Sequence, residues 1–164
     1  MAKKRRYRPV HEAYLTEWLG LKFPPGTWRT SVKLGDMLIR PEASTLTPSE
    51  RRLLLPFAAE ADAIVLYKKT LWIIEAMVRH EPGAGEDLLK YKALVPYTSS
   101  LQPYKDWPIK LVILTPLELG WYEQFYRSLG IQVEYYSPPW IIEYITSYPR
   151  RFWRGRLATL GGAA

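Results

Sequence analysis

An apolar run with a single carboxylate inside it most constrains how this chain can fold. Residues 71–79 (LWIIEAMVR) have the β-branched and aromatic character of a strand, and Glu75 lies in the middle of them. A carboxylate in such a strand is costly to bury unless it has a partner. Asp62 begins the preceding strand-like stretch, residues 60–67, and a tight turn over residues 68–70 joins the two. The pattern therefore predicts a β-hairpin with one acid on each strand.

Two carboxylates on adjacent strands can share a divalent cation, which relieves the cost of burial and can create a centre that cuts phosphodiester bonds. Asp62 and Glu75 are therefore candidate catalytic residues and candidate Mg²⁺ ligands. The alternation of a strand places Glu75, Met77 and Arg79 on one face. A structural alternative stays open, in which Asp62 caps a strand end and Glu75 pairs with Arg79 or a helix lysine.

The rest of the chain predicts an α/β domain with a mixed central sheet flanked by helices. Two Thr-Pro-x-Glu segments, at Thr47 and Thr115, have the form of capping boxes that open helices, and Gly130 suits the end of the second helix. On the first helix, Tyr14 (or Ala13), Trp18 and Leu21 are expected to face the core. Helices are predicted over 11–21, 47–55, 86–97, 115–129 and 140–145, and strands over 28–34, 60–67, 71–78, 110–115 and 131–136.

The order of these elements around Asp62 and Glu75 resembles the PD-(D/E)XK nuclease superfamily over residues 11–136. The resemblance implies a restriction-endonuclease-like fold and Mg²⁺-dependent cleavage of DNA. In that family the first acid begins one strand, and a Glu-x-Lys triplet lies near the end of the next. An acid on the first helix often contributes, for which Glu12 or Glu17 is the counterpart here. The helix after the hairpin carries residues that complete the site, and the segment 90–92 (KYK) matches it.

Met77 departs from this pattern at the position of the family's lysine. That lysine polarises the scissile phosphate and orients the attacking water, which a thioether cannot do. Arg79 is a poor substitute, because arginine stays charged and does not accept a proton. Lys90 or Lys92 could reach back from the helix, so both are candidate catalytic residues. His11 and His80 are interpreted as solvent-facing or satisfied side chains rather than as ligands or bases.

The net charge of +7 is concentrated at the two ends of the chain. Residues 1–10, a basic N-terminal arm, and residues 146–164, a basic aromatic tail, contain no acid, and they flank a single α/β domain at 11–145. Such segments commonly bind nucleic acid or an acidic protein surface, although a basic arm can also serve only solubility. The residues expected to contact DNA are Lys3, Lys4, Arg5, Arg6, Arg8, Arg79, Arg150, Arg151, Arg154 and Arg156.

Composition excludes several kinds of chemistry and bears on the source and location of the protein. The absence of cysteine excludes disulfides and thiol catalysis, and no glycine-rich phosphate loop is present. The absence of asparagine and the presence of only three glutamines favour a thermophilic source. No apolar run is long enough to span a bilayer and no secretory leader fits the start, so we expect a cytoplasmic or virion protein without membrane contact.

Two functions remain at this point. The favoured one is a nuclease fold with a degenerate site that serves as a DNA-binding or structural component of an assembly, such as a bacteriophage neck or head-completion protein. In that case, no cofactor is needed, and both termini would contact protein partners or further copies of the chain. The alternative is an active Mg²⁺-dependent DNA endonuclease or exonuclease.

Overall fold

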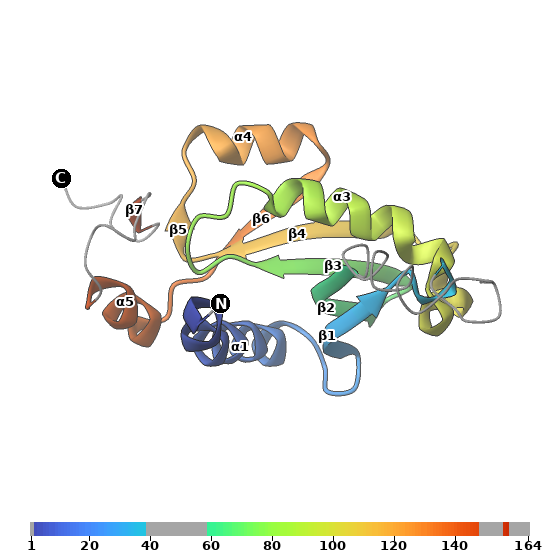
Figure 1. Cartoon of the computed structure of the whole chain (residues 1–164), viewed down its shortest axis with the longest axis horizontal. Coiled ribbons are helices and arrows are strands. Elements are labelled where there is room, and N and C mark those ends of the chain that lie inside the picture. The colour runs from blue at the N-terminus through green and yellow to red at the C-terminus, as the bar shows by residue number, and fades with distance from the viewer. Residues whose placement is uncertain (1, 39–58, 148–155, 158–164) are drawn as a thin grey trace.

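The protein is built on a five-stranded mixed sheet with the strand order β1-β2-β3-β4-β6 (Figure 1). The computed structural model describes residues 2–38, 59–147 and 156–157, and the side chains of residues 10–38 and 59–147. Strands β1 to β3 are antiparallel neighbours, whereas β3, β4 and β6 run parallel. The strands are β1 (Trp28–Leu34), β2 (Ala59–Tyr67), β3 (Thr70–Ala76), β4 (Ile109–Thr115) and β6 (Ile131–Tyr135).

Helices cover both faces of this sheet. Figure 1 shows α3 and α4 on one face and α1 and α5 on the other. Short 3₁₀ turns lie at Asp36–Leu38, Val95–Tyr97 and Ser99–Tyr104. The helices are α1 (Ala2–Lys22), α3 (Ala84–Leu94), α4 (Trp121–Ser128) and α5 (Pro139–Thr146).

Side chains that alternate along the central strands fill two apolar cores. Ile73 and Ile113 face α3 and α4, whereas Ile74 and Val112 belong to the core beneath α1 and α5. All four are completely buried. Strands β3 and β4 therefore bury both faces, as near-continuous apolar runs in a covered parallel sheet do.

The α/β class, the mixed sheet and the hairpin of β2 and β3 confirm the predictions from sequence. The hairpin turns through Lys68 and Lys69, which have φ values of 49° and 54°. Two positive φ values in a row are the geometry that matches the twist of paired strands in a tight hairpin. The helix predicted from Thr47 lies outside the described residues.

The first helix differs from its prediction in extent and in register. It begins at Ala2 rather than near residue 11, so the basic N-terminal stretch is continuous with α1. Leu21 is 72% exposed, and the core-facing stripe consists of Tyr14, Leu15, Trp18 and Leu19. The members of this stripe are four residues apart in pairs, and Leu21 lies on another face of the helix. The prediction that Leu21 faces the core was therefore wrong.

The capping box predicted at Thr115 is wrong. The Thr115 hydroxyl donates to the carbonyl oxygen of Met77 at 2.7 Å and accepts the N–H of Leu117 at 3.1 Å. Residues Leu117–Glu118 then form β5, which pairs with β7 (Arg156–Leu157), and α4 begins only after Gly120. The end of that helix confirms its prediction, because Gly130 has a φ of 77° just past the last turn.

None of the helices in the described part of the chain combines the length and the apolar character needed to cross a membrane.

Candidate functional site

The candidate site lies where β2 separates from β3 and where its pairing with β1 is interrupted at one residue. The pairing of β2 with β3 ends at Ala63 and Ile74, so the next two opposed residues, Asp62 and Glu75, are no longer joined by the ladder. The pairing of β1 with β2 also skips Asp62, opposite Ser31, which has a φ of 51°. On the side of β2, the backbone of β3 is therefore left without a strand partner at this point, while its other edge stays paired with β4.

Asp62 and His11 take the place of the missing strand partner. The backbone N–H of Ala76 donates to Asp62 Oδ2 at 2.8 Å. His11, from α1, places its Nε2 at 2.8 Å from the carbonyl oxygen of Ala76 and at 3.1 Å from Asp62 Oδ2. Because a carbonyl oxygen only accepts hydrogen bonds, this Nε2 carries the proton. Asp62 thus caps the open edge of β3, and a single histidine nitrogen bridges two oxygen atoms.

The pKa of His11 lies above its ordinary value of 6.5. Burial lowers this pKa. The increase caused by the contacts is larger than this decrease, and it comes from the hydrogen bond and the charge of Asp62, the hydrogen bond to Ala76 and the charge of Glu81. The side chains of His11 and Asp62 are only 27% and 23% exposed, so water screens their attraction weakly. The arrangement therefore favours a positively charged imidazolium between the two oxygens.

Glu75 is held in the neutral form. Burial raises its pKa most strongly, and the negative charges of Asp62, Asp87 and Glu81 raise it further, while the backbone N–H of Asp62 acts in the opposite direction. The result is a pKa of about 9. Its Oε2 is buried and has no hydrogen-bond partner among the described residues. At neutral pH, Glu75 is therefore a protonated carboxyl group.

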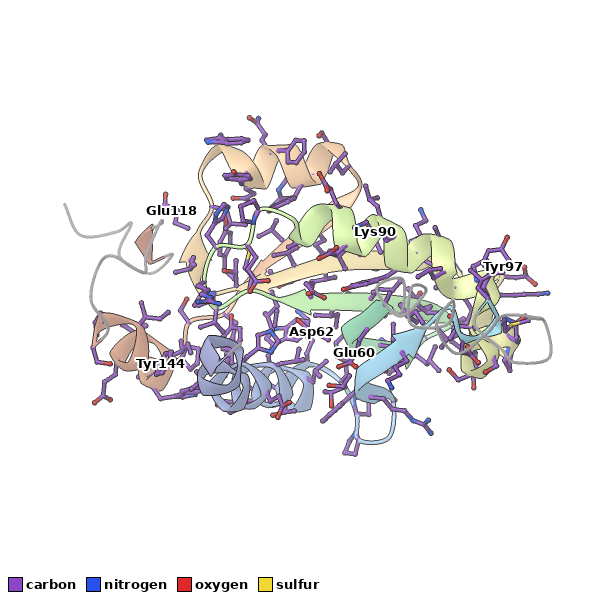
Figure 2. The ribbon with its side chains drawn as sticks, viewed as in Figure 1. Glu60, Asp62, Lys90, Tyr97, Glu118 and Tyr144 are labelled. Atoms are coloured by element: carbon purple, nitrogen blue, oxygen red, sulfur yellow. The ribbon has the colours of Figure 1, made fainter. Side chains whose placement is uncertain are left out.

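The lysines proposed to complete the site lie on the exposed side of α3. Lys90 is on α3, where its Nζ is 3.4 Å from Asp87 Oδ1, and Lys92 is exposed on the same helix. Figure 2 shows Lys90 on α3, with Asp62 on the side of β3 nearer to α1. Within the described residues, neither Asp62 nor Glu75 forms an ion pair with a lysine. The role of Lys90 or Lys92 as a catalytic lysine therefore stays a prediction.

Met77 and Arg79 also differ from a catalytic arrangement. Met77 is 1% exposed in the core beneath α3, and its sulfur accepts the N–H of Glu81 at 3.2 Å. Strand β3 ends at Ala76, so Arg79 lies in the bend that follows. The prediction that Arg79 shares a strand face with Glu75 is therefore wrong.

The contribution of α1 to the site comes from His11, which the sequence analysis interpreted as a solvent-facing or satisfied side chain and not as a site residue. Glu17, one of the two acids suggested for this role, accepts hydrogen bonds from the Tyr136 hydroxyl and from Trp140 Nε1 and so links α1 to α5. Among the contacts of α1, it is His11 that reaches Asp62. His11 precedes the buried Tyr14 and Leu15 by three and four residues, a spacing that marks the same helix face.

The residues present do not fit the divalent cation that the nuclease resemblance implies. The described residues contain no group of three or more His, Cys, Asp or Glu side chains that could hold a metal ion. The two oxygens that converge, from Asp62 and Ala76, already contact a proton-bearing nitrogen. The raised pKa of His11 favours the imidazolium form, whose positive charge would oppose a cation at the same oxygens.

The residues predicted to bind nucleic acid are placed only in part. Lys3, Lys4, Arg5, Arg6 and Arg8 belong to the first turns of α1, and Arg156 belongs to β7. Their side chains, like Arg150, Arg151 and Arg154, lie outside the described part of the chain.

Comparison with known proteins does not assign the chain to a family: no family model, curated protein or solved structure matches it.

The link between Asp62 and His11 predicts how His11 titrates. In the Asp62→Asn variant, the pKa of His11 should fall, because burial still lowers it while the carboxylate that raised it is gone. NMR titration of the imidazole ring protons measures this, and His80, the second of the two histidines, is an internal reference. An unchanged His11 pKa would contradict the contact.

The raised pKa of His11 also makes the stability of the folded state depend on pH. The folded state binds the imidazolium proton more tightly than the unfolded state does. The resulting stabilisation is complete below the ordinary pKa of 6.5 and is lost as the pH rises through the folded value.

Proposed function

We propose that this protein is a nucleic-acid-binding protein with a restriction-endonuclease-like core that has lost phosphodiester cleavage. The observation that carries the proposal is the His11 Nε2, which lies between Asp62 Oδ2 and the carbonyl oxygen of Ala76. In a metal-dependent nuclease, acidic and carbonyl oxygens at the ends of adjacent strands are free to bind a cation. Here the imidazole N–H of His11 contacts both oxygens instead.

The strand order supports the fold part of the proposal. Three antiparallel strands are followed by two parallel ones, with α3 and α4 on one face and α1 on the other. The two acids fall on β2 and β3 at the point where these strands separate. The elements also follow in the order on which the resemblance over residues 11–136 rests: hairpin, helix, buried strand, helix and strand.

The side chains at and near the two acids support the loss of catalysis. Hydrolysis of a phosphodiester needs an activated water and positive charge near the phosphate oxygens. Met77 is buried and apolar where the lysine is expected, and Lys90 pairs with Asp87. Glu75, with a pKa of about 9, is neutral at pH 7 and provides no charge for a cation.

The start of α1 supports the binding of an anionic partner. Five basic residues fall within residues 3–8 of this helix, and its first turn has no acid. The N-terminal end of a helix carries a partial positive charge, so added cations there raise the free energy of the folded state. The phosphates of a nucleic acid relieve this repulsion and release bound counterions.

The same features suit a structural role in a DNA-containing assembly, such as a bacteriophage neck or head-completion component. Two basic chain ends can contact DNA, while exposed aromatic side chains on the domain offer contacts to protein neighbours. Such a role requires DNA binding and does not require cleavage.

The salt dependence of binding tests the proposal. Changing Arg150, Arg151 and Arg154 together to glutamine is expected to weaken binding to duplex DNA about tenfold or more, and to reduce the slope of log K against log salt concentration by up to about 3. Fluorescence anisotropy over a series of salt concentrations measures both quantities.

The matched control removes the same number of charges elsewhere. Lys33, Lys69 and Lys105 are exposed lysines of the domain, and their change to glutamine should alter affinity and slope much less. Equal losses in both variants would mean that binding reflects net charge alone. No DNA binding by the unaltered protein would refute the proposed function.

A further inference from the structure

The sheet ends at β6, whose outer side faces no other strand in the described part of the chain. The N–H of Tyr136, just past the end of β6, donates to the carbonyl oxygen of Thr115 on β4 at 3.1 Å. Because the backbone of a strand alternates between its two sides, Ile131, Val133 and Tyr135 direct their N–H and C=O groups away from β4. These groups form the row of donors and acceptors by which a sheet edge pairs with a further strand.

The two edges of the sheet differ in how well they are protected against pairing. Strand β1, at the opposite edge, contains Ser31, which has a φ of 51°, and carries the exposed bases Arg29 and Lys33. Kinks and basic side chains on an edge strand oppose the pairing of two copies, because they bend the edge and repel like charges. Residues 131–135 have no positive φ and no basic residue. Of the two edges, β6 is therefore the one without these obstacles.

The side chains of β6 are complementary to a second, antiparallel copy of the same strand. A two-fold axis at Val133 places Ile131 opposite Tyr135 of the second copy, and such β-branched and aromatic pairs stabilise adjacent strands. The same axis places Gln132 opposite Glu134 of the second copy, so each carboxylate faces an amide that can donate to it. The backbone agrees with this register, because residues that point outward meet one another and exchange both hydrogen bonds. An axis at Glu134 would instead place two carboxylates opposite each other, which is destabilising.

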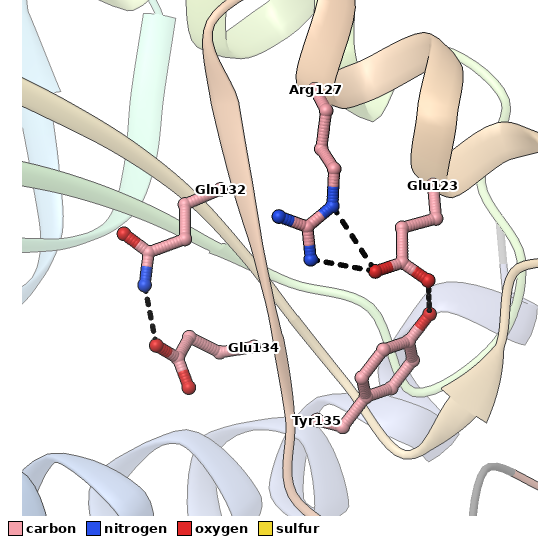
Figure 3. A network of polar contacts seen from close by, with 5 residues as sticks. All are labelled: Glu123, Arg127, Gln132, Glu134 and Tyr135. Carbon is pink, nitrogen blue, oxygen red and sulfur yellow. Dashed lines mark hydrogen bonds and ion pairs between the residues drawn. The ribbon is translucent and has the colours of Figure 1, made fainter.

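The side chains of the single copy already show the contacts that this register needs. Figure 3 shows Gln132 and Glu134 on one side of β6, and Tyr135 with Glu123 and Arg127 on the other. Gln132 Nε2 donates to Glu134 Oε1 at 2.5 Å, so an amide and a carboxylate at these positions bind one another. The Tyr135 hydroxyl donates to Glu123 Oε2 at 2.7 Å, and this residue stays 38% exposed at the end of the edge.

An exposed leucine of α1 lies near the same edge. Leu21 is 72% exposed, and it follows Glu17 by four residues, which places both side chains on one face of the helix. Glu17 accepts a hydrogen bond from the hydroxyl of Tyr136, the residue after β6. Leu21 therefore lies on the side of α1 that contacts the end of β6, where a second copy would remove apolar area from water.

The charge of this part of the surface also suits a second copy. Two copies of a chain with a net charge of +7 repel each other, so a contact between them favours the surface with the least positive charge. The charged residues of the segment 111–147 are Arg127, Glu118, Glu123, Glu134 and Glu143. Next to β6, Arg127 Nη2 lies 2.7 Å from Glu123 Oε1, and Lys22 Nζ lies 4.0 Å from Glu134 Oε1. The β6 edge thus lacks the excess of positive charge that the whole chain carries.

We propose that β6 pairs antiparallel with β6 of a second copy of this chain, about a two-fold axis at Val133. The two five-stranded sheets then join into one continuous sheet. The inference goes beyond the proposed function and does not depend on nucleic-acid binding.

The test measures the oligomeric state of the full chain without nucleic acid, by sedimentation velocity over a range of protein concentrations. The unaltered protein should form a dimer. Gln132→Glu should raise the dissociation constant of this dimer about tenfold, because two carboxylates then face each other at two places related by the axis. Gln132→Lys puts an ammonium group opposite Glu134 and should not raise it. Gln124→Glu and Gln124→Lys make the same changes on the exposed side of α4 and should leave it unchanged.

Hydrogen exchange shows whether the edge itself is paired. The amide protons of Val133 and Tyr135 should exchange more slowly at concentrations where the dimer forms than in the dilute monomer, because pairing protects them. If Gln132→Glu lowers the melting temperature of the monomer, this measurement on the unaltered protein decides the question.

Three outcomes would overturn the inference. A protein that stays monomeric at every concentration has no such interface. A dimer that responds equally to Gln132→Glu and Gln124→Glu is not held by the β6 edge. A dimer in which the amides of Val133 and Tyr135 gain no protection is formed through another surface. Each of these results leaves the proposed function untouched, since none of the measurements involves nucleic acid.

Discussion

Changing Glu75 to glutamine is expected to stabilise the protein, and the gain should grow with pH. The Glu75 carboxyl group has a pKa of about 9 because it is buried and lies near other acids. Between its ordinary pKa of 4.5 and this value, the folded state keeps a proton that the unfolded state has released. Stability therefore falls as the pH rises through this range. Glutamine has nearly the same shape and does not ionise, so the variant should not lose stability in this way as the pH rises.

The expected gain at about pH 8 is on the order of 1–3 kcal/mol in the free energy of unfolding, with a much smaller change at about pH 5. Urea unfolding at the two pH values measures it. Glu86→Gln is the matched control, because Glu86 is exposed on α3 and its change should have little effect at either pH. A loss of stability in Glu75→Gln at about pH 8 would mean that Glu75 is ionised and paired.

Changing His11 to alanine is expected to cost on the order of 1–3 kcal/mol, because the partly buried Asp62 and the carbonyl oxygen of Ala76 lose their shared partner. The variant should also gain a response to divalent cations. Oxygens that His11 satisfied become available to a cation, and a ligand that binds only the folded state raises its melting temperature. Mn²⁺ should therefore raise the melting temperature of His11→Ala and leave that of the unaltered protein nearly unchanged.

His11→Gln is the conservative variant. A glutamine side chain keeps an N–H donor that can reach the same oxygens, so it should lose less stability than alanine and respond more weakly to Mn²⁺. If Mn²⁺ stabilised the unaltered protein as strongly as His11→Ala, the imidazole would not be taking the place of a cation.

Much of the fold follows from local sequence patterns. The strand-like runs 60–67 and 71–78, with the tight turn between them, predicted the hairpin, and the apolar run 110–115 predicted a strand buried on both faces. These features depend on neighbours in sequence, so periodicity reveals them. The capping box at Thr115 failed because the Thr115 hydroxyl bonds Met77, a residue on another strand. A tertiary hydrogen bond of this kind leaves no trace in the local pattern.

The site was predictable only in part. The placement of Asp62 and Glu75 on adjacent strands could be predicted from the two acids and the turn between the strands. The role of His11 could not be assigned in this way, because it depends on how α1 crosses the sheet. Its helical phase with Tyr14 and Leu15 was the available signal, since it places His11 on the buried side. The position of Lys90, paired with Asp87 on the surface of α3, likewise depends on tertiary packing.

We propose that the chain binds DNA and does not cut it, because His11 contacts the oxygens that would otherwise bind a cation. The most direct measurement incubates the purified protein with plasmid DNA and Mg²⁺ or Mn²⁺, beside the Asp62→Ala variant, and follows binding and DNA integrity in the same samples. We expect the unaltered protein to slow the migration of the plasmid in a gel, and the plasmid to be intact after the protein is removed. Cleavage by the unaltered protein, absent in Asp62→Ala, would contradict the proposal.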